Sequence, residues 1–502
     1  MPRIFRRARA GHVIVAAAAL PLVFSVASTG PAYAEPGAPP ERQIADSIKA
    51  PDVKQHLERF QAIANANGRT RAAGTPGYDA SRDYVAGELR RAGYQVTLQA
   101  FEFQTFRERT TAVMEQVSNG RTSYKPTAPG GSEFGDFATL TYSGSGEAKA
   151  KVQGVDLVLP PGSQPNSSTS GCEAADFAGF TRGNIALLQR GSCTFADKAR
   201  NAQAAGAAGV IIFNEGQPGR TDTFTEPLDE KGISVPVVGT SFAVGKDLAA
   251  AKPVVRLKTD TESAPRTTHN VLAESKQGNP DKVVMAGAHL DSVRAGAGIN
   301  DNGSGSAGLL EVALQMASVT PKNKLRFAWW GAEELGLIGS KYYVQNLSAA
   351  NRAKIKLYLN FDMIGSTNFA YKIYNGSSGP AGSAQIEQNF NRYFDSRNLP
   401  HVRTPLDGRS DYGPFMRAGI PVGGLFTGAE GIKTSQEQRL FGGQAGRPYD
   451  PCYHRSCDTT ANISDTALTV NTGAIADAMQ TYAAADVLPG RTPVAAETPT
   501  HE

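Results

Sequence analysis

Long apolar runs are scarce in this chain of 502 residues. A helix that crosses a bilayer needs about 20 consecutive apolar residues. The apolar stretch from Val13 to Val26 is shorter than that, and no later segment reaches this length. The sequence therefore argues against a membrane-spanning protein. Its 40% hydrophobic and 20% charged residues are ordinary for a soluble globular protein.

Dense runs of Lys and Arg are also missing beyond the first 34 residues. These first residues carry four arginines and no acidic residue, so without them the formal net charge falls from +4 to zero. A neutral chain without a basic patch gives no electrostatic basis for binding nucleic acid. The sequence therefore predicts no nucleic-acid partner.

The basic start of the chain has the pattern of a secretory signal peptide. Four arginines precede the apolar stretch, and the small residues "AYA" end at Ala34. We expect cleavage before Glu35, which predicts a secreted, extracellular protein that has no membrane contact after cleavage. An uncleaved membrane anchor is the alternative, and the short apolar stretch disfavours it.

Cysteine is scarce, with four in the chain. An oxidising compartment is expected to pair them. Local pairing is the simplest of the three possible connectivities. It joins Cys172 to Cys193 and Cys452 to Cys457. A zinc site built from cysteines is the alternative.

Changes in composition predict how the chain is organised. Residues 124–261 are rich in Gly, Ala and Val, with short strands around one Ala-rich helix, which is typical of a small α+β module. After this module, apolar strands alternate with helical stretches, the pattern of a parallel sheet covered on both faces. We therefore expect a signal peptide at 1–34, a Pro-rich spacer at 35–50, a main domain in two parts at 51–123 and 262–487, the inserted module at 124–261, and a disordered tail at 488–502.

Polar residues follow three apolar strand candidates of the main domain, "KVVMAGA", "KLRFAWW" and "KIKLYLNF". His289 follows the first, Glu333 and Glu334 the second, and Asp362 the third. The carboxyl ends of parallel strands meet at one edge of a sheet, so these residues should converge. Histidine and carboxylates from separate loops, in a chain without a nucleotide-binding glycine motif, predict a divalent metal site.

The stretch "AGAHLDSVRAGAGINDNGSG" fits this site, although on its own it could be a glycine-rich surface loop. It contains His289 and a second ligand type, Asp301. Its glycines allow the backbone to turn tightly around an ion. We expect Asn300 and Asn302 to hold Asp301 in place through local hydrogen bonds.

The neighbouring Glu333 and Glu334 should have different roles. Adjacent carboxylates repel each other, and successive side chains of extended backbone point in opposite directions. One can coordinate metal while the other faces the bound water as general base. A solvated acidic loop is the alternative, but a buried strand directly before the pair favours function.

A second metal needs a second histidine, and the chain has seven histidines in all. His454 is our candidate because it lies in "YDPCYHRSCD", where a short disulfide loop would hold Tyr453 and His454 rigid. The other five besides His289 are set aside, as leader, tail, charged-helix or structural residues: His12, His501, His56, His269 and His401.

These segments, together with "GRSDYGPF" and "GGLFTGA", resemble the secreted bacterial di-zinc aminopeptidases of the actinomycete leucyl-aminopeptidase type. The resemblance covers residues 51–103 and 269–487. The segment "LLQRGSCTFADKARNAQAAGAAGVIIFN" resembles a protease-associated (PA) domain. The resemblance implies an α/β fold: a mixed, mostly parallel sheet flanked by helices, the zinc exopeptidase fold, with a smaller inserted α+β PA domain.

The resemblance also implies roles for individual residues. His289 and Asp362 would hold one zinc, Glu334 and His454 the other, and Asp301 would bridge both. Glu333 would be the general base. Three further groups of residues would contact the substrate: Tyr453 at the oxyanion, Arg409 through its backbone near the α-amine, and Met363 with Phe426 in the side-chain pocket, where core packing is the alternative.

The function implied is a zinc-dependent aminopeptidase that removes amino-terminal residues, large hydrophobic ones such as Leu, from peptides with a free amino terminus. We expect a monomer, and the sequence leaves any effect of calcium open. Two alternatives are a zinc carboxypeptidase on the same scaffold and a non-catalytic binding protein. The "GRSDYGPF" match disfavours the first, and the presence of all five ligands and the base disfavours the second.

Overall fold

A computed structural model describes residues 44–490, except for residues 119, 121, 129–132 and 229–231. The predicted signal peptide lies outside the described residues, as do most of the spacer and of the tail. The end of the predicted spacer contains the short helix α1 (Ile44–Ser47). Among the helices that the structure describes, none combines the length and apolar character needed to cross a membrane.

One sheet path connects the strands in the order β13-β12-β14-β11-β9-β10-β8-β4-β5-β6-β7-β3. In the main domain, β9 is central: β10 and β11 pair with it in parallel on either side, and β11 pairs in parallel with β14. These strands and their neighbours are β8 (Val254–Glu274), β9 (Asn279–His289), β10 (Asn323–Trp330), β11 (Ile355–Phe361), β12 (Lys372–Tyr374), β13 (Val402–Thr404) and β14 (Val422–Phe426).

Helices cover both faces of this sheet because its strands bury both of their faces. In β9, Val284 and Ala286 belong to one apolar cluster, whereas Val283 and Met285 belong to another. This alternation is the two-residue period of a strand. The first cluster includes residues of α1, α2 (Ala50–Ala66), α3 (Pro76–Arg91), α6 (Gly305–Met316), α9 (Ser383–Ser396) and α12 (Asp465–Ala484); the second includes residues of α7 (Ile338–Gln345) and α10 (Tyr412–Arg417).

Two short helices and two single turns complete the main domain. The helices are α8 (Ala349–Lys354) and α11 (Ser435–Phe441). The turns are η2 (Ile299–Ser304), whose backbone is irregular at Asp301, and η3 (Gly376–Ser378).

The inserted module builds its own parallel sheet, in which β4, β5, β6 and β7 pair in order. Separate apolar clusters lie on the two faces of this sheet. Its elements are β3 (Phe137–Thr139), β4 (Gly146–Gly154), η1 (Ala174–Phe177), β5 (Ile185–Gln189), α4 (Phe195–Ala204), β6 (Gly209–Phe213), β7 (Val237–Thr240) and α5 (Phe242–Ala251). The two-residue strand β2 (Thr122–Ser123) precedes the module. The predicted fold class, a mostly parallel α/β sheet with a smaller α+β part, is confirmed.

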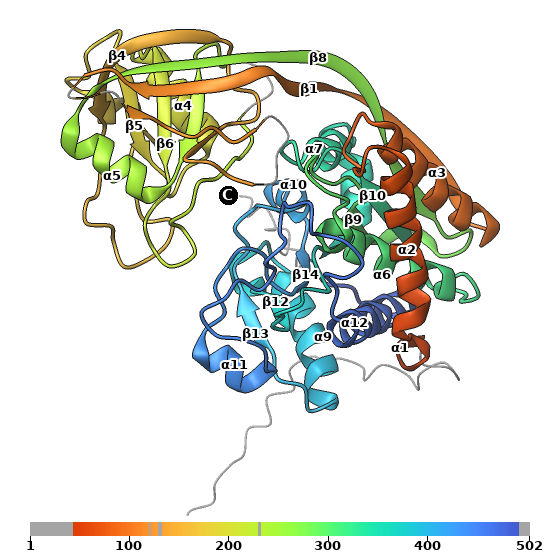
Figure 1. Cartoon of the computed structure of the whole chain (residues 1–502). Helices are drawn as coiled ribbons and strands as arrows, with labels where there is room; N and C mark the ends of the chain where they lie inside the picture. Colours follow the sequence, from red (N-terminus) through yellow and green to blue (C-terminus); the bar gives the residue numbers. More distant parts are fainter. Residues whose placement is uncertain (1–43, 119, 121, 129–132, 229–231, 491–502) are drawn as a thin grey trace, which may run out of the picture. The chain divides into compact units, whose positions relative to one another are not determined.

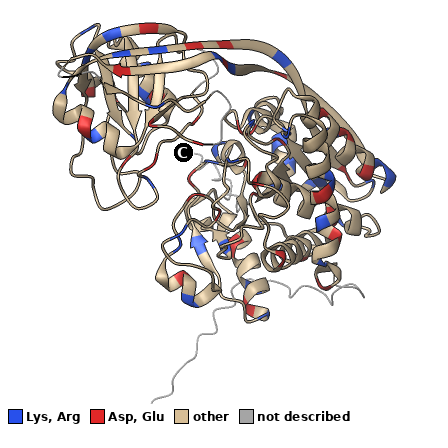
Figure 2. Cartoon of the chain, in the orientation of Figure 1, with Lys and Arg blue, Asp and Glu red and all other residues tan. Residues whose placement is uncertain are grey.

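The long strands β1 (Gln95–Gln116) and β8 run side by side as an antiparallel ribbon (Figure 1). The predicted module boundary at Thr261 falls inside β8. Charges of both signs line the ribbon (Figure 2), and cross-strand pairs such as Arg107 with Glu262 join them. An exposed pair of this kind contributes at most about 1 kcal/mol, so backbone pairing is the main force holding the ribbon.

Candidate active site

His289 is the last residue of β9 and is almost completely buried. Its Nε2 atom lies 3.3 Å from Oδ1 of Asp301 and 3.4 Å from Oδ1 of Asp362, the residue after β11. Its other ring nitrogen, Nδ1, is 3.1 Å from the backbone carbonyl of Asp291. A hydrogen bond from Nδ1 leaves Nε2 as the nitrogen that can bind a metal.

His454 forms a second group of the same composition. Its Nε2 atom lies 3.1 Å from Oδ2 of Asp301 and 3.1 Å from Oε2 of Glu334. Asp301 therefore belongs to both groups and turns one oxygen toward each histidine. The structure brings together all five residues that the sequence predicted as ligands.

Glu333 and Glu334 follow β10 and face different histidines. Glu334 approaches His454, whereas Oε2 of Glu333 lies 3.9 Å from Nε2 of His289. The backbone N–H groups of both glutamates donate to the buried carboxylate of Asp291, at 3.1 and 3.3 Å. This shared anchor fixes the backbone of the pair while its two side chains diverge.

Burial and neighbouring charges shift the pKa values of the side chains in this cluster. Burial raises the pKa of Glu333 well above its usual value, and the nearby carboxylates of Asp411 and Glu334 raise it further. Burial disfavours the charged form of His289, but Glu333 and Asp362 outweigh this effect and raise the pKa of His289 well above its usual value. Four carboxyl groups thus crowd around two imidazoles, and a bound cation would stabilise the ionised form of these carboxyl groups.

Two carboxylate oxygens of the site are buried without a hydrogen-bond partner among the described residues: Oε1 of Glu334 and Oδ1 of Asp362. Buried polar atoms are nearly always hydrogen-bonded, so such orphans call for a ligand. Imidazole and carboxylate donors suit zinc. The residues present therefore fit a pair of zinc ions.

Asp301 is held by residues that are distant in the sequence. The N–H groups of Asn300 and Asp301 donate to the carboxylate of Asp458, at 2.8 and 3.0 Å. The side chain of Asn300 donates to Asp450 at 2.7 Å, and that of Asn302 to the carbonyl of Phe361 at 2.9 Å.

The prediction that both asparagines act through local bonds is therefore wrong in part. Their amide groups reach other loops, because η2 is buried among them. One local bond exists, from Gly305 N–H to Oδ1 of Asn302, at 2.9 Å.

Both disulfides have the pairing that we expected, Cys172 with Cys193 and Cys452 with Cys457. The second closes the loop that carries Tyr453 and His454, whose rings stack at a centroid distance of 3.8 Å. Burial raises the pKa of Tyr453 well above its usual value. The phenol therefore stays protonated and can donate a hydrogen bond into the site.

The three other residues predicted to contact substrate have mixed surroundings. Met363 is buried directly after Asp362, and Phe426, at the end of β14, is partly buried against an aromatic cluster. The guanidinium of Arg409 lies 2.9 Å from Glu430 and 3.8 Å from Glu226.

Sequence reasoning gave no role to Ser410 or Asp458, which support the site. The hydroxyl of Ser410 donates to Oδ2 of Asp362 at 2.6 Å. Both residues lie inside quoted segments, "GRSDYGPF" and "YDPCYHRSCD", so their position beside predicted site residues was the available signal.

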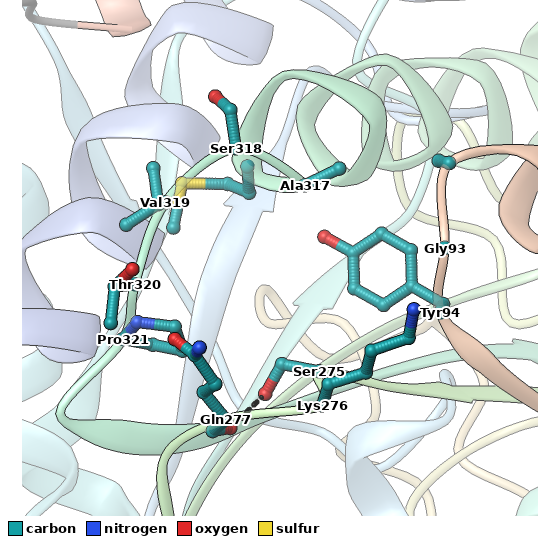
Figure 3. Close-up of a pocket in the computed structure, with 12 residues that line it drawn as sticks. Gly93, Tyr94, Ser275, Lys276, Gln277, Ala317, Ser318, Val319, Thr320 and Pro321 are labelled. Carbon is teal, nitrogen blue, oxygen red and sulfur yellow. Dashed lines mark hydrogen bonds between the residues drawn. The ribbon is translucent and has the colours of Figure 1, made fainter.

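A hollow of about 220 Å³ lies away from these residues, and Figure 3 shows the side chains that line it. Ser275, Lys276 and Gln277 line it after the end of β8, and β8 is antiparallel to β10. The hollow therefore lies near the amino end of β10, whereas the candidate ligands follow the carboxyl ends of the strands. It is not part of the metal cluster.

Comparison with known proteins agrees with this geometry. The model of Peptidase family M28 matches residues 270–479, and the PA domain model matches residues 153–248. An aminopeptidase of Pseudomonas aeruginosa is 47% identical over 454 residues, which cover 86% of this chain and 80% of that protein. The chain belongs to Peptidase family M28.

Other relatives of this peptidase agree. Leucine aminopeptidase 2 of Trichophyton rubrum is 38% identical over 88% of this chain and 85% of its own length. Among solved structures, the aminopeptidase from Aneurinibacillus sp. strain AM-1 matches with a TM-score of 0.67 and 27% identity, covering 89% of this chain and 96% of that one. The match extends over both modules.

Proposed function

We propose that this peptidase is a secreted aminopeptidase that uses two zinc ions to remove amino-terminal residues, large hydrophobic ones such as Leu, from peptides. Its family and the activities named for its relatives make it a zinc-dependent aminopeptidase. The observation that carries the two-metal proposal is Asp301, which presents one oxygen to each of two histidine–carboxylate groups.

The ligand set follows from those two groups. His289 and Asp362 would hold one zinc, Glu334 and His454 would hold the other, and Asp301, which faces both histidines, would be shared between them. When bound, the pair of ions polarises the scissile carbonyl and makes a water molecule acidic enough to attack near neutral pH.

Glu333 acts as the general base. Its carboxylate lies beside His289 without being needed as a ligand. It accepts a proton from the attacking water and then delivers that proton to the leaving amine, so each turnover restores the carboxylate. The hydroxyl of Tyr453 donates a hydrogen bond to the oxyanion as negative charge develops on the former carbonyl oxygen.

Binding of the substrate's amino terminus also relies on negative charge. The carboxylates of Glu333 and Asp362 attract the ammonium group, and the backbone of Arg409 contributes to the same subsite. Met363 and Phe426 line the pocket for the first side chain. A buried acidic cluster discriminates against a neutral, acetylated amine, because acetylation leaves a desolvated carboxylate without its charged partner.

The organisation of the chain supports secretion. We propose that residues 1–34 are removed and that residues 124–261 form a PA domain inserted between the two parts of the peptidase domain, 51–123 and 262–487. Residues 35–50 and 488–502 then flank a monomeric enzyme as spacer and tail. The two disulfides suit an oxidising, extracellular compartment.

The decisive experiment uses one leucine-initiated peptide in three forms: free, N-acetylated and C-amidated. With zinc present, we expect release of leucine from the free and the amidated peptide and none from the acetylated one. Cleavage of the acetylated form from its carboxyl end would instead identify a carboxypeptidase. Zinc content is measured on the same preparation, and two bound zinc ions without turnover of any form would point to a non-catalytic binding protein.

A further inference from the structure

Arg71 is a completely buried arginine that no part of the proposed reaction uses. It lies between α2 and α3 and faces the ligand loop (residues 290–298), which joins the end of β9 to η2. Its side chain donates to three backbone carbonyls of this loop. Nε reaches Ala297 at 2.8 Å, Nη2 reaches Gly298 at 2.5 Å, and Nη1 donates to Leu290.

A guanidinium in this position is costly, because burial of a charge is unfavourable unless it is well paired. Burial lowers the pKa of Arg71 to about 10, although the carboxylates of Asp291 and Asp458 act in the opposite direction. The hydrogen bonds of its guanidinium go to carbonyls, and the guanidinium lies 5.0 Å from the centre of the Phe60 ring.

A role for this arginine is visible in where the three carbonyls lie along the chain. Leu290 directly follows His289, and Gly298 lies three residues before Asp301. One rigid, planar group therefore ties together both ends of the ligand loop. The backbone of Arg71 also contacts this loop: its N–H group donates to the hydroxyl of Ser292 at 3.0 Å.

Asp458 holds the other side of the same backbone. Its carboxylate accepts the N–H groups of Asn300 and Asp301, while Arg71 holds carbonyls just before them. Between these two charged groups, the backbone that carries Asp301 has little freedom. The resulting distance from Nε2 of His289 to Oδ1 of Asp301 is 3.3 Å.

We propose that Arg71 is a positioning residue: it sets the spacing of His289 and Asp301 and thereby the affinity of the site for zinc. This inference rests on the proposed function, because it concerns the same metal site. A lysine could not replace it, since a single ammonium cannot reach three carbonyls in fixed directions. Loss of such a supporting contact typically weakens metal binding 10–100-fold.

The test measures zinc affinity by competition with a chromophoric chelator, and thermal unfolding of the metal-free protein, for wild type, Arg71→Lys and Arg326→Lys. Arg326 is the matched control, because it is a largely buried arginine of the same domain that bonds Glu274 and Tyr343 instead. We expect Arg71→Lys to bind zinc 10–100-fold more weakly, whereas Arg326→Lys keeps wild-type affinity even if its unfolding temperature falls.

A chemical rescue sharpens the result. Arg71→Ala leaves a space shaped for guanidinium, so added guanidinium at non-denaturing concentration should restore zinc affinity in that variant and not in Arg71→Lys. If Arg71→Ala does not fold, Arg71→Lys alone decides. Wild-type zinc affinity in Arg71→Lys would overturn the proposal, as would an equal loss in Arg326→Lys. Failure of the wild type itself to bind zinc would instead refute the proposed function.

Discussion

Both modules place carboxylates just after parallel strands, but the two sets of carboxylates are satisfied differently. In the inserted module, Glu215 follows β6 and is fully buried, and its two oxygens accept N–H groups from Asn166, Ser167 and Ser168, at 2.7, 2.8 and 3.2 Å. In the main domain, Glu334 and Asp362 each leave one buried oxygen without a hydrogen-bond partner among the described residues. Position at a strand end is common to both modules, so it does not by itself mark a site. Buried atoms without a partner also occur elsewhere, as at Oε1 of Gln217 in the inserted module, so the metal cluster is distinguished by unsatisfied carboxylates that lie beside two histidines.

The basic side chains buried in the two modules also differ in how their charge is balanced. Lys198 of the inserted module is buried, donates to the carbonyl of Ser170, and has the carboxylate of Glu215 in its surroundings. Its charge and that of Glu215 are balanced within the module. The two histidines of the metal cluster, His289 and His454, instead face a surplus of carboxyl groups. Lys198 and Glu215 therefore stabilise the fold of the inserted module, whereas Glu334 and Asp362 of the metal cluster keep carboxylate oxygens available for a ligand.

The largest expected effect tests the main-domain half of this comparison. Glu333→Gln removes the base but no ligand, so we expect kcat/KM on a leucine anilide to fall about 10²–10⁴-fold while zinc content stays unchanged. Activity assays and atomic absorption on the same preparation measure both quantities.

Asp301→Ala is the contrasting variant for that experiment. It removes the bridge, so activity and zinc stoichiometry should fall together. If Glu333→Gln lost its metal instead, the roles of Glu333 and Glu334 would have to be exchanged.

The next effect is the pH dependence of the free energy of unfolding that Lys198 gives to the inserted module. Burial lowers the pKa of Lys198 to about 8, from 10.5 in the unfolded chain. Between these values the unfolded state binds one more proton than the native state, so the free energy of unfolding rises with pH through this window. The gain is at most ~3 kcal/mol. The carboxylates that oppose the lowering are those of Glu215, Asp176, Asp156 and Asp197.

Lys198→Met isolates this contribution. Denaturant unfolding at about pH 7.5 and about pH 10.5 should show the wild type gaining stability relative to the variant, since all other titrating groups are shared. An unchanged difference between the two proteins would mean that Lys198 keeps its proton in the native state across this range.

Some features of the fold and of the candidate site could be predicted from the sequence, and others could not. The meeting of His289, Glu334 and Asp362 was predictable, because each follows a parallel strand and the carboxyl ends of such strands converge. Asp301 and His454, the other two candidate ligands, could be selected only from the motifs that contain them. The periodicity of "SRDYVAGELRRAGYQVTLQAFEF" indicates an amphipathic helix that runs into a strand, and α3 and β1 agree with that pattern. Hydrogen-bond partners that are distant in the sequence were not predictable. Arg71 and Gly298 are 227 residues apart, and periodicity carries no information on such contacts.

The errors have the same origin. The amide of Asn300 was expected to act locally, but burial of η2 brings Asp450 within reach, 150 residues away. The apolar residues of "KVQGVDLVL" favour one strand through the whole segment, but β4 ends at Gly154, because the chain turns at Asp156, whose φ is +46°. Local apolar pattern could not reveal either feature.

A smaller effect tests the hydrogen bonds that the carboxylate of Glu215 accepts within the inserted module. Glu215→Ala leaves three buried N–H groups without their acceptor, so we expect the free energy of unfolding to fall by ~1–3 kcal/mol. Zinc content and activity on the anilide at low temperature should not change. Loss of zinc in this variant would contradict the distinction between a structural and a ligand-binding carboxylate.

The smallest effect belongs to a second glutamate of the same module, Glu226. It is partly exposed, and its carboxylate lies 3.8 Å from both Arg190 and Arg409. Arg409 keeps a shorter pair with Glu430, at 2.9 Å; although burial acts against ionisation, this pair and Arg190 lower the pKa of Glu430 to about 2. Because long, solvent-accessible pairs contribute ~0–1 kcal/mol, Glu226→Gln should lower the free energy of unfolding by no more than that.

Glu215→Ala and Glu226→Gln together separate burial from mere charge. Both remove one negative charge from the inserted module, so a purely electrostatic role would give similar losses that shrink alike in high salt. We expect instead that the Glu215 loss is larger and persists in salt, because it reflects unsatisfied N–H groups, while the Glu226 loss disappears. Denaturant unfolding of both variants at low and high salt measures this difference. Equal, salt-sensitive losses would mean that the hydrogen bonds of Glu215 contribute little to the free energy of unfolding. Hydrogen bonding of a buried oxygen would then not distinguish a structural carboxylate from a ligand-binding one.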